Sequence, residues 1–320
     1  MSARDLPRAD SDVAATVVGW GATEGRPTRR EPQRFGTIVI VGGGCYGSYY
    51  LRQLTRARDA GAIEYARIIV VDRDPRCRVA RAAADARAGA AAARTAPAPA
   101  PAGPGGPPRL EGATDWVVEP HHLAAVHVEI APWEEFLPAY FDAACADPTR
   151  VAGDAVVPSP LMPHLAPGWL AARARRRWPE RAVSTPALEA EPNTPWQRAA
   201  ADGGTHYVSF ATWMCPINCI EPRTCPETRG PRSWSMPEAA RAYVADARAR
   251  GQALVGPLLF HCEHRAFGVG MFDTRCAIDA DAALATAVAA ALPDAPVRAL
   301  VASVSNCHGA WSVVEVGARA

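Results

Sequence analysis

Two stretches, TIVIVGGGCYGSYYL (residues 37–51) and IIVVDRDP (residues 68–75), decide the fold that this sequence predicts. The first opens with a continuous β-branched run, which is typical of a parallel strand buried on both faces. A glycine-rich turn follows, and the next residues carry apolar side chains at helical spacing until Gly61 ends the segment. The second stretch is another buried strand, and it ends in an acid, Asp72. This order predicts a nucleotide-binding βαβ unit.

The glycines of the turn have the spacing G-x-G-x-x-G, with Gly42, Gly44 and Gly47 between a strand and a helix. Gly42 would permit the tight turn, Gly44 would let the backbone approach a pyrophosphate, and Gly47 would let helix and strand pack closely. The anion would bind free N–H groups at the start of the helix. The predicted cofactor-binding residues are Gly42, Gly43, Gly44, Cys45, Tyr46, Gly47, Asp72 and Arg73. Asp72 favours NAD and Arg73 would accept the 2′-phosphate of NADP, so both cofactors stay open.

The segments VIVGGGCYGSYYLRQL and VVDRDPRCRVA, within about residues 37–80, resemble the NAD-binding Rossmann domains of the TrkA N-terminal type and their relatives. These relatives include the N-terminal domain of siroheme synthase. The resemblance implies binding of NAD(H) or NADP(H) at Gly42, Gly44, Gly47 and Asp72. It implies a class of ligand rather than a reaction. S-adenosylmethionine-dependent methyltransferases also end their second strand in an acid, although the third glycine fits the dinucleotide pattern better.

The rest of the chain predicts an α/β fold with a doubly wound, mainly parallel Rossmann-like sheet, followed by an α+β region rich in cysteine and histidine. Strands and helices alternate over residues 36–165, interrupted by an Ala-Pro and Gly-Pro rich surface insertion at 88–108. Residues 1–35 are polar and aperiodic, so we expect a disordered arm. Residues 166–205 read as a connector, and the Cys/His-rich domain covers 206–320.

The segment MCPINCIEPRTCPETRGPRSW (residues 214–234) places Cys215, Cys219 and Cys225 in a C-x₃-C-x₅-C run. Prolines this dense are incompatible with a regular helix or a central strand. Three thiols in such a loop point to a soft or borderline metal, because thiolates bind these ions and a loop can wrap one. The alternative is that the cysteines are buried as small hydrophobic residues.

Three thiolates leave a four-ligand site one ligand short. Our first choice for the fourth is Cys262 and our second is Cys307. Further candidates are Cys276, His206, His261, His264 and His308. Four thiolates, or three and one other ligand, would suit a [4Fe–4S] cluster, whereas zinc would take a closed tetrahedral site. The cluster type stays open, because the spacing departs from the ferredoxin run.

Glu263, His264 and His308 are the predicted catalytic residues. In a strand, His261 and Glu263 share one face while His264 points away, so this is not a helical H-E-x-x-H motif. Glu263 with His264 or His308 would supply general acid–base chemistry. The alternative is a set of hydrogen-bonded polar residues at a strand end.

Composition excludes several classes of function. The net charge of +1 argues against a nucleic-acid binder that neutralises phosphates. The chain contains no lysine, which excludes Schiff-base chemistry and a P-loop lysine. The N-terminus has no apolar signal-peptide core and no run reaches the length of a membrane span, so we expect a cytoplasmic protein without membrane insertion.

These observations predict a cytoplasmic redox protein that binds NAD or NADP and holds an iron–sulfur cluster. Its partner would be a small-molecule substrate or an electron-transfer protein, and an oligomer is compatible with the sequence. One alternative is a nucleotide-sensing regulator with a structural zinc site. Another is a methyltransferase whose C-terminal region is stabilised by zinc.

Overall fold

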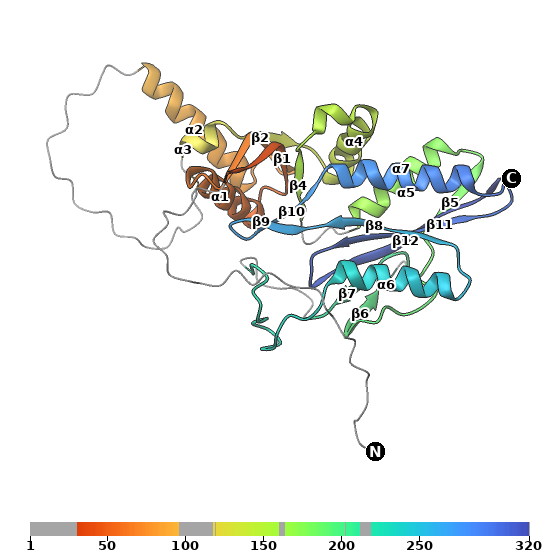
Figure 1. Ribbon diagram of the computed structural model, residues 1–320. Coiled ribbons are helices and arrows are strands. Elements are labelled where there is room, and N and C mark those ends of the chain that lie inside the picture. Colours follow the sequence, from red (N-terminus) through yellow and green to blue (C-terminus); the bar gives the residue numbers. More distant parts are fainter. Residues whose placement is uncertain are drawn as a thin grey trace. The chain divides into compact units, whose positions relative to one another are not determined.

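Strand β1 (Gln33–Val41) lies inside a six-stranded sheet with the order β3-β2-β1-β4-β10-β9, as the computed structural model shows (Figure 1). β1 pairs in parallel with β2 and β4, and β2 pairs in parallel with β3. β10 is antiparallel to both β4 and β9. The bounds are β2 (Ile63–Asp72), β3 (His127–Ile130), β4 (Ala155–Val157), β9 (Glu263–Ala266) and β10 (Val269–Asp273). This first sheet is therefore mixed.

The structure describes residues 31–95, 118, 120–159, 164–201, 203–211 and 219–319. The chain divides into residues 1–31 and 32–320, and the following description concerns the second unit. Most of the arm predicted at 1–35 and of the insertion predicted at 88–108 lies outside the described residues. Where they are described, β1 begins at Gln33 and helix α2 (Arg78–Thr95) continues to Thr95.

A second sheet has the order β6-β7-β12-β11-β8, and β5 also pairs with β12. Its centre is the antiparallel pair of β11 (Val297–Val304) and β12 (His308–Arg319), with Val304 opposite Gly309 at the turn. β8 (Leu254–His261) runs parallel to β11. The remaining bounds are β5 (Arg181–Ser184), β6 (Trp196–Ala199) and β7 (His206–Ser209). The apolar runs on either side of residues 306–309 predict two strands joined near this segment, and β11 and β12 confirm them.

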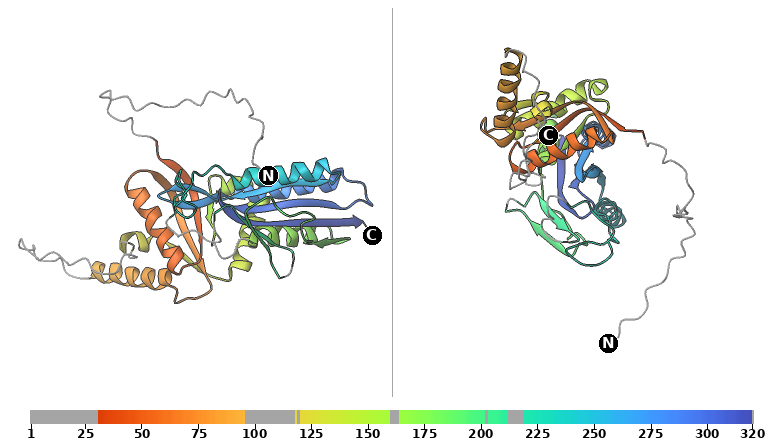
Figure 2. Two further views of the ribbon diagram at one scale, coloured as in Figure 1. Left: turned by 90° about the horizontal axis from the view of Figure 1, so that it is seen from below. Right: turned by 90° about the vertical axis from the view of Figure 1, so that its left-hand side faces the viewer.

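Helices cover both faces of each sheet (Figures 1 and 2). α1 (Cys45–Asp59), α2 and α3 (Pro120–Ala124) bury leucines and valines against one face of the first sheet. α6 (Met236–Ala249) packs on one face of the second sheet. The helices α4 (Trp133–Ala146), α5 (Leu165–Arg177) and α7 (Arg275–Ala290) contribute to a core that includes strands of both sheets. A single-turn 3₁₀ helix, η1 (Pro148–Val151), follows α4.

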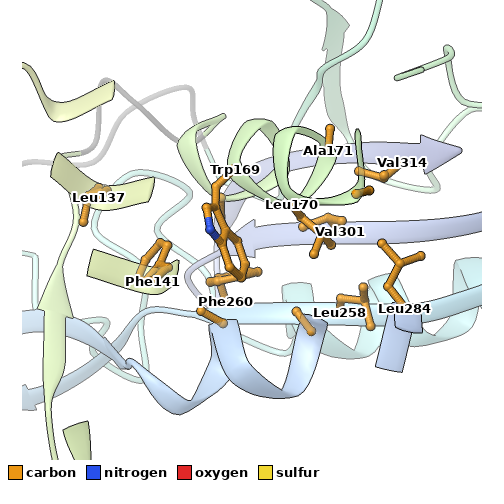
Figure 3. Close-up of a cluster of buried hydrophobic side chains, with 14 of the residues drawn as sticks. Leu137, Phe141, Trp169, Leu170, Ala171, Leu258, Phe260, Leu284, Val301 and Val314 are labelled. Atoms are coloured by element: carbon orange, nitrogen blue, oxygen red, sulfur yellow. The ribbon is translucent and has the colours of Figure 1, made fainter. Parts of the chain in front are cut away.

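The shared core is centred on aromatic rings (Figure 3). Phe141 of α4 lies edge-on to Trp169 of α5, with ring centroids 5.1 Å apart. Phe260 of β8 and Phe272 of β10 meet at 5.5 Å, also edge-on. All four side chains are buried. Since Phe260 and Phe272 come from strands of different sheets, a continuous hydrophobic core joins the two sheets.

The chain passes from the second sheet to the first at one residue, Cys262, which lies between β8 and β9. The Cys262 amide donates to the carbonyl oxygen of Val304 over 2.7 Å, which anchors this crossing to the β11–β12 turn. β9 and β10 then form a hairpin whose turn residues Phe267 and Gly268 both have positive φ, 44° and 78°. A hairpin must be antiparallel.

The predicted α/β class is confirmed in this mixed form, but the sheets are partly antiparallel rather than mainly parallel. The physical reason is that the C-terminal part of the chain is built from hairpins, and one of them, β9–β10, extends the first sheet. None of the helices in the described part is long and apolar enough to span a lipid bilayer.

Candidate functional site

The glycine turn connects β1 to α1 and has different requirements at each glycine. Gly42 has φ of +96°, a conformation that favours glycine, and its amide donates to the Val71 carbonyl oxygen over 2.8 Å. A Cβ on Gly47 would lie 1.7 Å from the carbonyl oxygen of Gly42, so only glycine fits there. A Cβ on Gly44 would meet no atom within 4 Å, and this residue is exposed. The turn therefore packs tightly at Gly47 and leaves open space at Gly44 among the described residues.

The first turn of α1 faces this open space with unpaired backbone donors. Gly44 is the N-cap, and no side chain accepts a hydrogen bond from the first N–H groups. Free N–H groups at a helix start bind anions, and the helix dipole adds to the attraction. Cys45 is exposed and Tyr46 half-buried in this turn. Of the predicted residues, Gly44 and Cys45 are thus exposed at the start of α1, whereas Gly42, Gly43 and Gly47 are buried.

Asp72 ends β2 directly beside the turn. One carboxylate oxygen accepts from the Gly43 amide over 2.7 Å and the other from the Asp74 amide over 2.9 Å. Each carboxylate oxygen can accept a second hydrogen bond, so capacity for ribose hydroxyls remains. Arg73 is exposed and its guanidinium lies 6.0 Å from the Trp133 ring centroid. The structure therefore brings the predicted acid and arginine to the glycine turn.

Of the predicted metal ligands, Cys215 lies outside the described residues. Cys225 and Cys307 are buried, and Cys219 and Cys262 are half-buried. In the part of the chain that is described, no three Cys, His, Asp or Glu side chains are placed to hold one metal ion. The described thiols therefore do not form a metal site by themselves.

The described thiols instead gather around charged and polar groups of the loop at 219–235. We use the name Cys/His cluster for Cys219, Glu221, Cys225, Arg232, Cys262, His264, Cys307 and His308. Arg232 interacts with three of these residues. Burial alone would lower the pKa of its guanidinium, but Cys307, Glu221 and Cys219 raise it. Trp234 donates its indole N–H to the sulfur of Cys307 over 3.5 Å.

The thiols of the cluster differ in their ionisation. Burial, and next the charge of Glu221, raises the pKa of Cys262 to about 12, so this thiol is protonated at neutral pH. Burial also raises the pKa of Cys307, against the opposing effect of Trp234 and Arg232. For Cys225, burial opposes ionisation, but N–H groups of Thr228 and Glu227 and the Thr228 hydroxyl donate to the sulfur, and the net pKa is lowered. The pKa of Cys225 is thus shifted in the direction opposite to those of Cys262 and Cys307.

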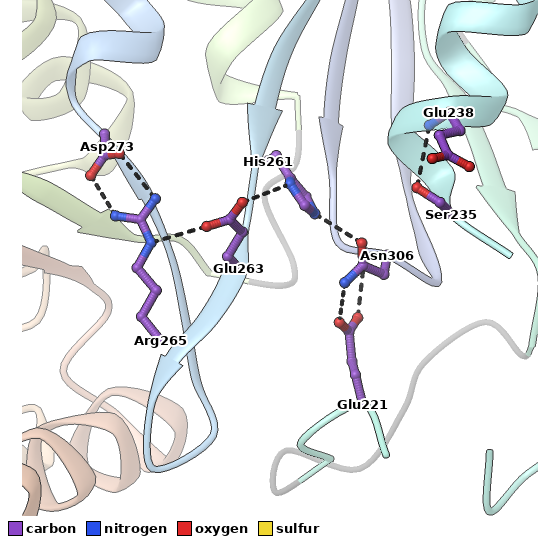
Figure 4. Close-up of polar contacts among 8 residues, drawn as sticks. All are labelled: Glu221, Ser235, Glu238, His261, Glu263, Arg265, Asp273 and Asn306. Atoms are coloured by element: carbon purple, nitrogen blue, oxygen red, sulfur yellow. Dashed lines mark hydrogen bonds and ion pairs between the residues drawn. The ribbon is translucent and has the colours of Figure 1, made fainter. Parts of the chain in front are cut away.

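A chain of polar side chains runs from the first sheet to this cluster (Figure 4). Asp273 of β10 binds Arg265, Arg265 binds Glu263, and Glu263 lies 3.3 Å from Nδ1 of His261. The Nε2 atom of His261 lies 3.1 Å from Oδ1 of Asn306.

The chain ends on Glu221. Asn306 donates to the Glu221 carboxylate from its amide side chain over 2.7 Å and from its backbone N–H over 3.1 Å. Since the side-chain amide donates to Glu221, its oxygen is the acceptor for His261. Both ring nitrogens of His261 then face acceptors, Oε1 of Glu263 and Oδ1 of Asn306.

The predicted catalytic residues separate into two groups. Glu263 is exposed and pairs with His261 and Arg265 in the polar chain. His264 and His308 lie instead within electrostatic range of Glu221. Burial is the main cause that lowers the pKa of both histidines, and His264 lowers that of His308 further. The two imidazoles are neutral at neutral pH, and Glu221 is the carboxylate whose charge acts on both of them.

Sequence reasoning missed Glu221, Arg232, Asn306 and Tyr50. Glu221 has φ of 52°, which is unusual for a non-glycine residue and typical of functional loops. A carboxylate between prolines of the cysteine loop was the available signal for it. Arg232 and Asn306 carried no such signal, because their role depends on the contacts of distant segments.

The cluster and the glycine turn meet at α1. This helix contacts β9 and β10, and burial with the added charge of Cys262 raises the pKa of Tyr50. Tyr50 is in the second turn of α1, the helix that begins at the glycine turn. A ligand on the turn would therefore lie on the same helix that borders the cluster.

Residues 166–317 match the model of the AF_1314_C family, described as "Uncharacterized protein, C-terminal domain". The match covers the second sheet, the β9–β10 hairpin and the whole Cys/His cluster, but not the glycine turn. A search of curated proteins and a search of solved structures found no match.

Proposed function

We propose that this chain is an NAD(P)-binding redox protein in which the glycine turn holds the dinucleotide beside the Cys/His cluster. The observation that carries the proposal is the division of roles among three glycines. Gly42 has a positive φ, Gly44 has open space above it, and Gly47 packs against the Gly42 carbonyl. These are the three requirements of a dinucleotide-binding turn.

The strand order supports a Rossmann-like first domain. β3, β2, β1 and β4 are parallel neighbours in the order of one half of a doubly wound sheet. The order reverses between β1 and β4, and ligands of such sheets bind at the carboxyl ends of the strands at this point. The glycine turn follows the carboxyl end of β1.

The residues fit NAD(P) in the following roles. Backbone N–H groups at Cys45 to Gly47 would hold the pyrophosphate, and Asp72 the ribose hydroxyls. Arg73 is exposed next to Asp72 and would accept a 2′-phosphate, so NAD and NADP both stay open. The bound nicotinamide would supply or take up a hydride. Neutral His264 and His308, with Glu221 in range of both, are the groups that would take up or release the accompanying proton.

Calorimetric titration of the full chain with NADH, NADPH and S-adenosylmethionine tests the proposal. We expect one of the dinucleotides to bind and to stabilise the protein by about 2.7 kcal/mol when present at about 100 times its dissociation constant. Binding of S-adenosylmethionine alone would assign the chain to the methyltransferases. Failure of all three ligands to bind would contradict the proposed function.

Redox activity is tested separately with NADH or NADPH and an artificial electron acceptor. Oxidation of the dinucleotide that depends on the protein supports an oxidoreductase. Tight binding without any oxidation would favour the nucleotide-sensing regulator instead.

An iron–sulfur cluster, or zinc as the alternative, stays a prediction from the C-x₃-C-x₅-C spacing. Cys225 supports it, since hydrogen bonds to its sulfur favour the thiolate that a metal needs. Iron, labile sulfide and zinc are to be measured on protein purified without oxygen. Visible absorption that dithionite bleaches is expected for the cluster, whereas colourless protein with stoichiometric zinc would replace it by a structural site.

A further inference from the structure

The guanidinium of Arg232 has hydrogen-bond donors that the protein leaves unused. Nη1 donates to the Pro222 carbonyl oxygen. Nε and Nη2 are buried, and within the described residues no hydrogen-bond acceptor of good geometry reaches them. The group beside them is the thiol of Cys307, and a thiol is a weak acceptor. A buried charged donor that faces only a thiol is costly, so an oxyanion reaching Nε and Nη2 would satisfy donors that Cys307 satisfies poorly.

The obvious internal partner, Glu221, is held elsewhere. Its carboxylate accepts both N–H groups of Asn306, and Asn306 is in turn oriented by His261. No ion pair connects Arg232 with a carboxylate anywhere in the described ranges. The positive φ of Glu221 shows that the backbone is strained into this arrangement. The polar chain in Figure 4 therefore occupies the Glu221 carboxylate with hydrogen bonds from Asn306.

The unused donors have the geometry of an oxyanion site. Nε and Nη2 lie on the same edge of the planar guanidinium, and this edge binds a carboxylate or a phosphate through two parallel hydrogen bonds. A second unpartnered atom, the buried Nδ1 of His264, belongs to the same cluster. An imidazole nitrogen can donate or accept a hydrogen bond there.

We propose that Arg232 binds an oxyanion, a carboxylate or phosphate group carried by the small-molecule substrate. Asn306 and His261 position Glu221 so that this arginine stays available. This site adds detail to the proposed function. It rests on that function for one point only, namely that the anion belongs to the substrate that reacts with the dinucleotide. In that case the group that reacts would lie between Arg232 and α1, near His264 and Cys262.

The experiment measures the affinity of the full chain for inorganic phosphate and for acetate by calorimetry at constant ionic strength. Arg232→Met keeps a similar volume but removes the charge, and we expect it to weaken binding by about 10- to 100-fold. Arg232→Lys keeps the charge without the planar edge and should lose part of the affinity. Arg223→Met, an exposed arginine of the same loop, is the matched control and should bind like the wild type.

The outcomes distinguish this site from the dinucleotide site. Unchanged affinity for NADH and NADPH in Arg232→Met is expected, and loss of dinucleotide affinity would instead assign the arginine to a cofactor phosphate and overturn the proposal. Equal oxyanion binding by wild type and Arg232→Met would also overturn it. If the wild type binds oxyanions through Arg232 but no dinucleotide, the anion site stands and the redox function fails. Should Arg232→Met not fold, by circular dichroism, the comparison of Arg232→Lys with Arg223→Met decides.

Discussion

Replacing Gly44 with alanine should abolish dinucleotide binding while leaving the fold intact. The new methyl group would meet no atom of the described residues within 4 Å, so it has room in the free protein. The remaining cost is the preference for glycine over alanine at an N-cap, up to about 1 kcal/mol of unfolding free energy. The methyl group would instead occupy the space that a pyrophosphate needs.

Gly47→Ala is the matched comparison, because the same methyl group there meets backbone. Its Cβ would lie 1.7 Å from the Gly42 carbonyl oxygen, whereas ordinary contact begins near 3.4 Å. The turn or α1 must therefore move by about 1.7 Å, and overpacking of this kind costs about 1–3 kcal/mol or more. This variant should lose both stability and binding.

Denaturant unfolding and calorimetric titration with NADH and NADPH, applied to both variants, give the two readouts. The reasoning requires Gly44→Ala to unfold within about 1 kcal/mol of the wild type and to bind neither dinucleotide. Undiminished binding by Gly44→Ala would refute the assignment of the turn, because no ligand phosphate would then approach its backbone. A large loss of stability in Gly44→Ala would show that the residue is structural.

Three further changes test other parts of the molecule. Phe141→Ala removes a ring at the centre of the shared core and should lower the unfolding free energy by about 3–5 kcal/mol in denaturant melts. For Asp281, burial opposes ionisation, but hydrogen bonds from two arginines of α5 lower its pKa below the unfolded value. This carboxylate therefore stabilises the fold above the unfolded pKa of about 4, and the stabilisation is lost as pH falls through the folded pKa. Asp281→Asn should lower the unfolding free energy by about 1.5–3 kcal/mol at pH 7. It should also make the unfolding free energy less dependent on pH in the acid range. Asn306→Ala removes the side-chain hydrogen bond to Glu221 and keeps the backbone one, which leaves one carboxylate oxygen available to Arg232. Calorimetry should then show weaker phosphate binding, and unchanged binding would mean that the Asn306 side chain does not hold the two apart.

Local patterns in the sequence predicted the elements well where one physical cause dominates. The run at 37–41 is buried on both faces, as its β-branched residues indicated. The turn that joins β11 to β12 was also predicted, because polar residues interrupt two apolar strands. The mixed pairing of the first sheet was not predictable in this way. β9 and β10 are separated from β4 by about a hundred residues, and periodicity carries no information on which sheet a hairpin joins.

The candidate site was predictable to the same limited extent. The glycine spacing identified the turn, since each glycine answers a local backbone requirement. Cys262, His264, Cys307 and His308 were singled out by residue type, and the structure places them in one cluster. Strand alternation put His261 on the same face as Glu263, and the two are paired, but Asp273 and Asn306 at the ends of this polar chain were not foreseen, because alternation does not give what lies on other strands and turns. Arg232 acquires its role only through the tertiary position of Glu221 and Asn306.

The crossing at Cys262 gives the two halves of the site a fixed relationship. A flexible connection between a cofactor domain and a cysteine-rich domain would let the two drift apart. Here one residue separates β8, which is bonded to β11, from β9, which contacts α1. The Cys262 amide is bonded to Val304 at the β11–β12 turn, and Asn306 on that turn holds Glu221. α1 and Glu221 are thus connected through β9, the Cys262 amide and the β11–β12 turn, so the glycine turn and the polar chain belong to one packed unit.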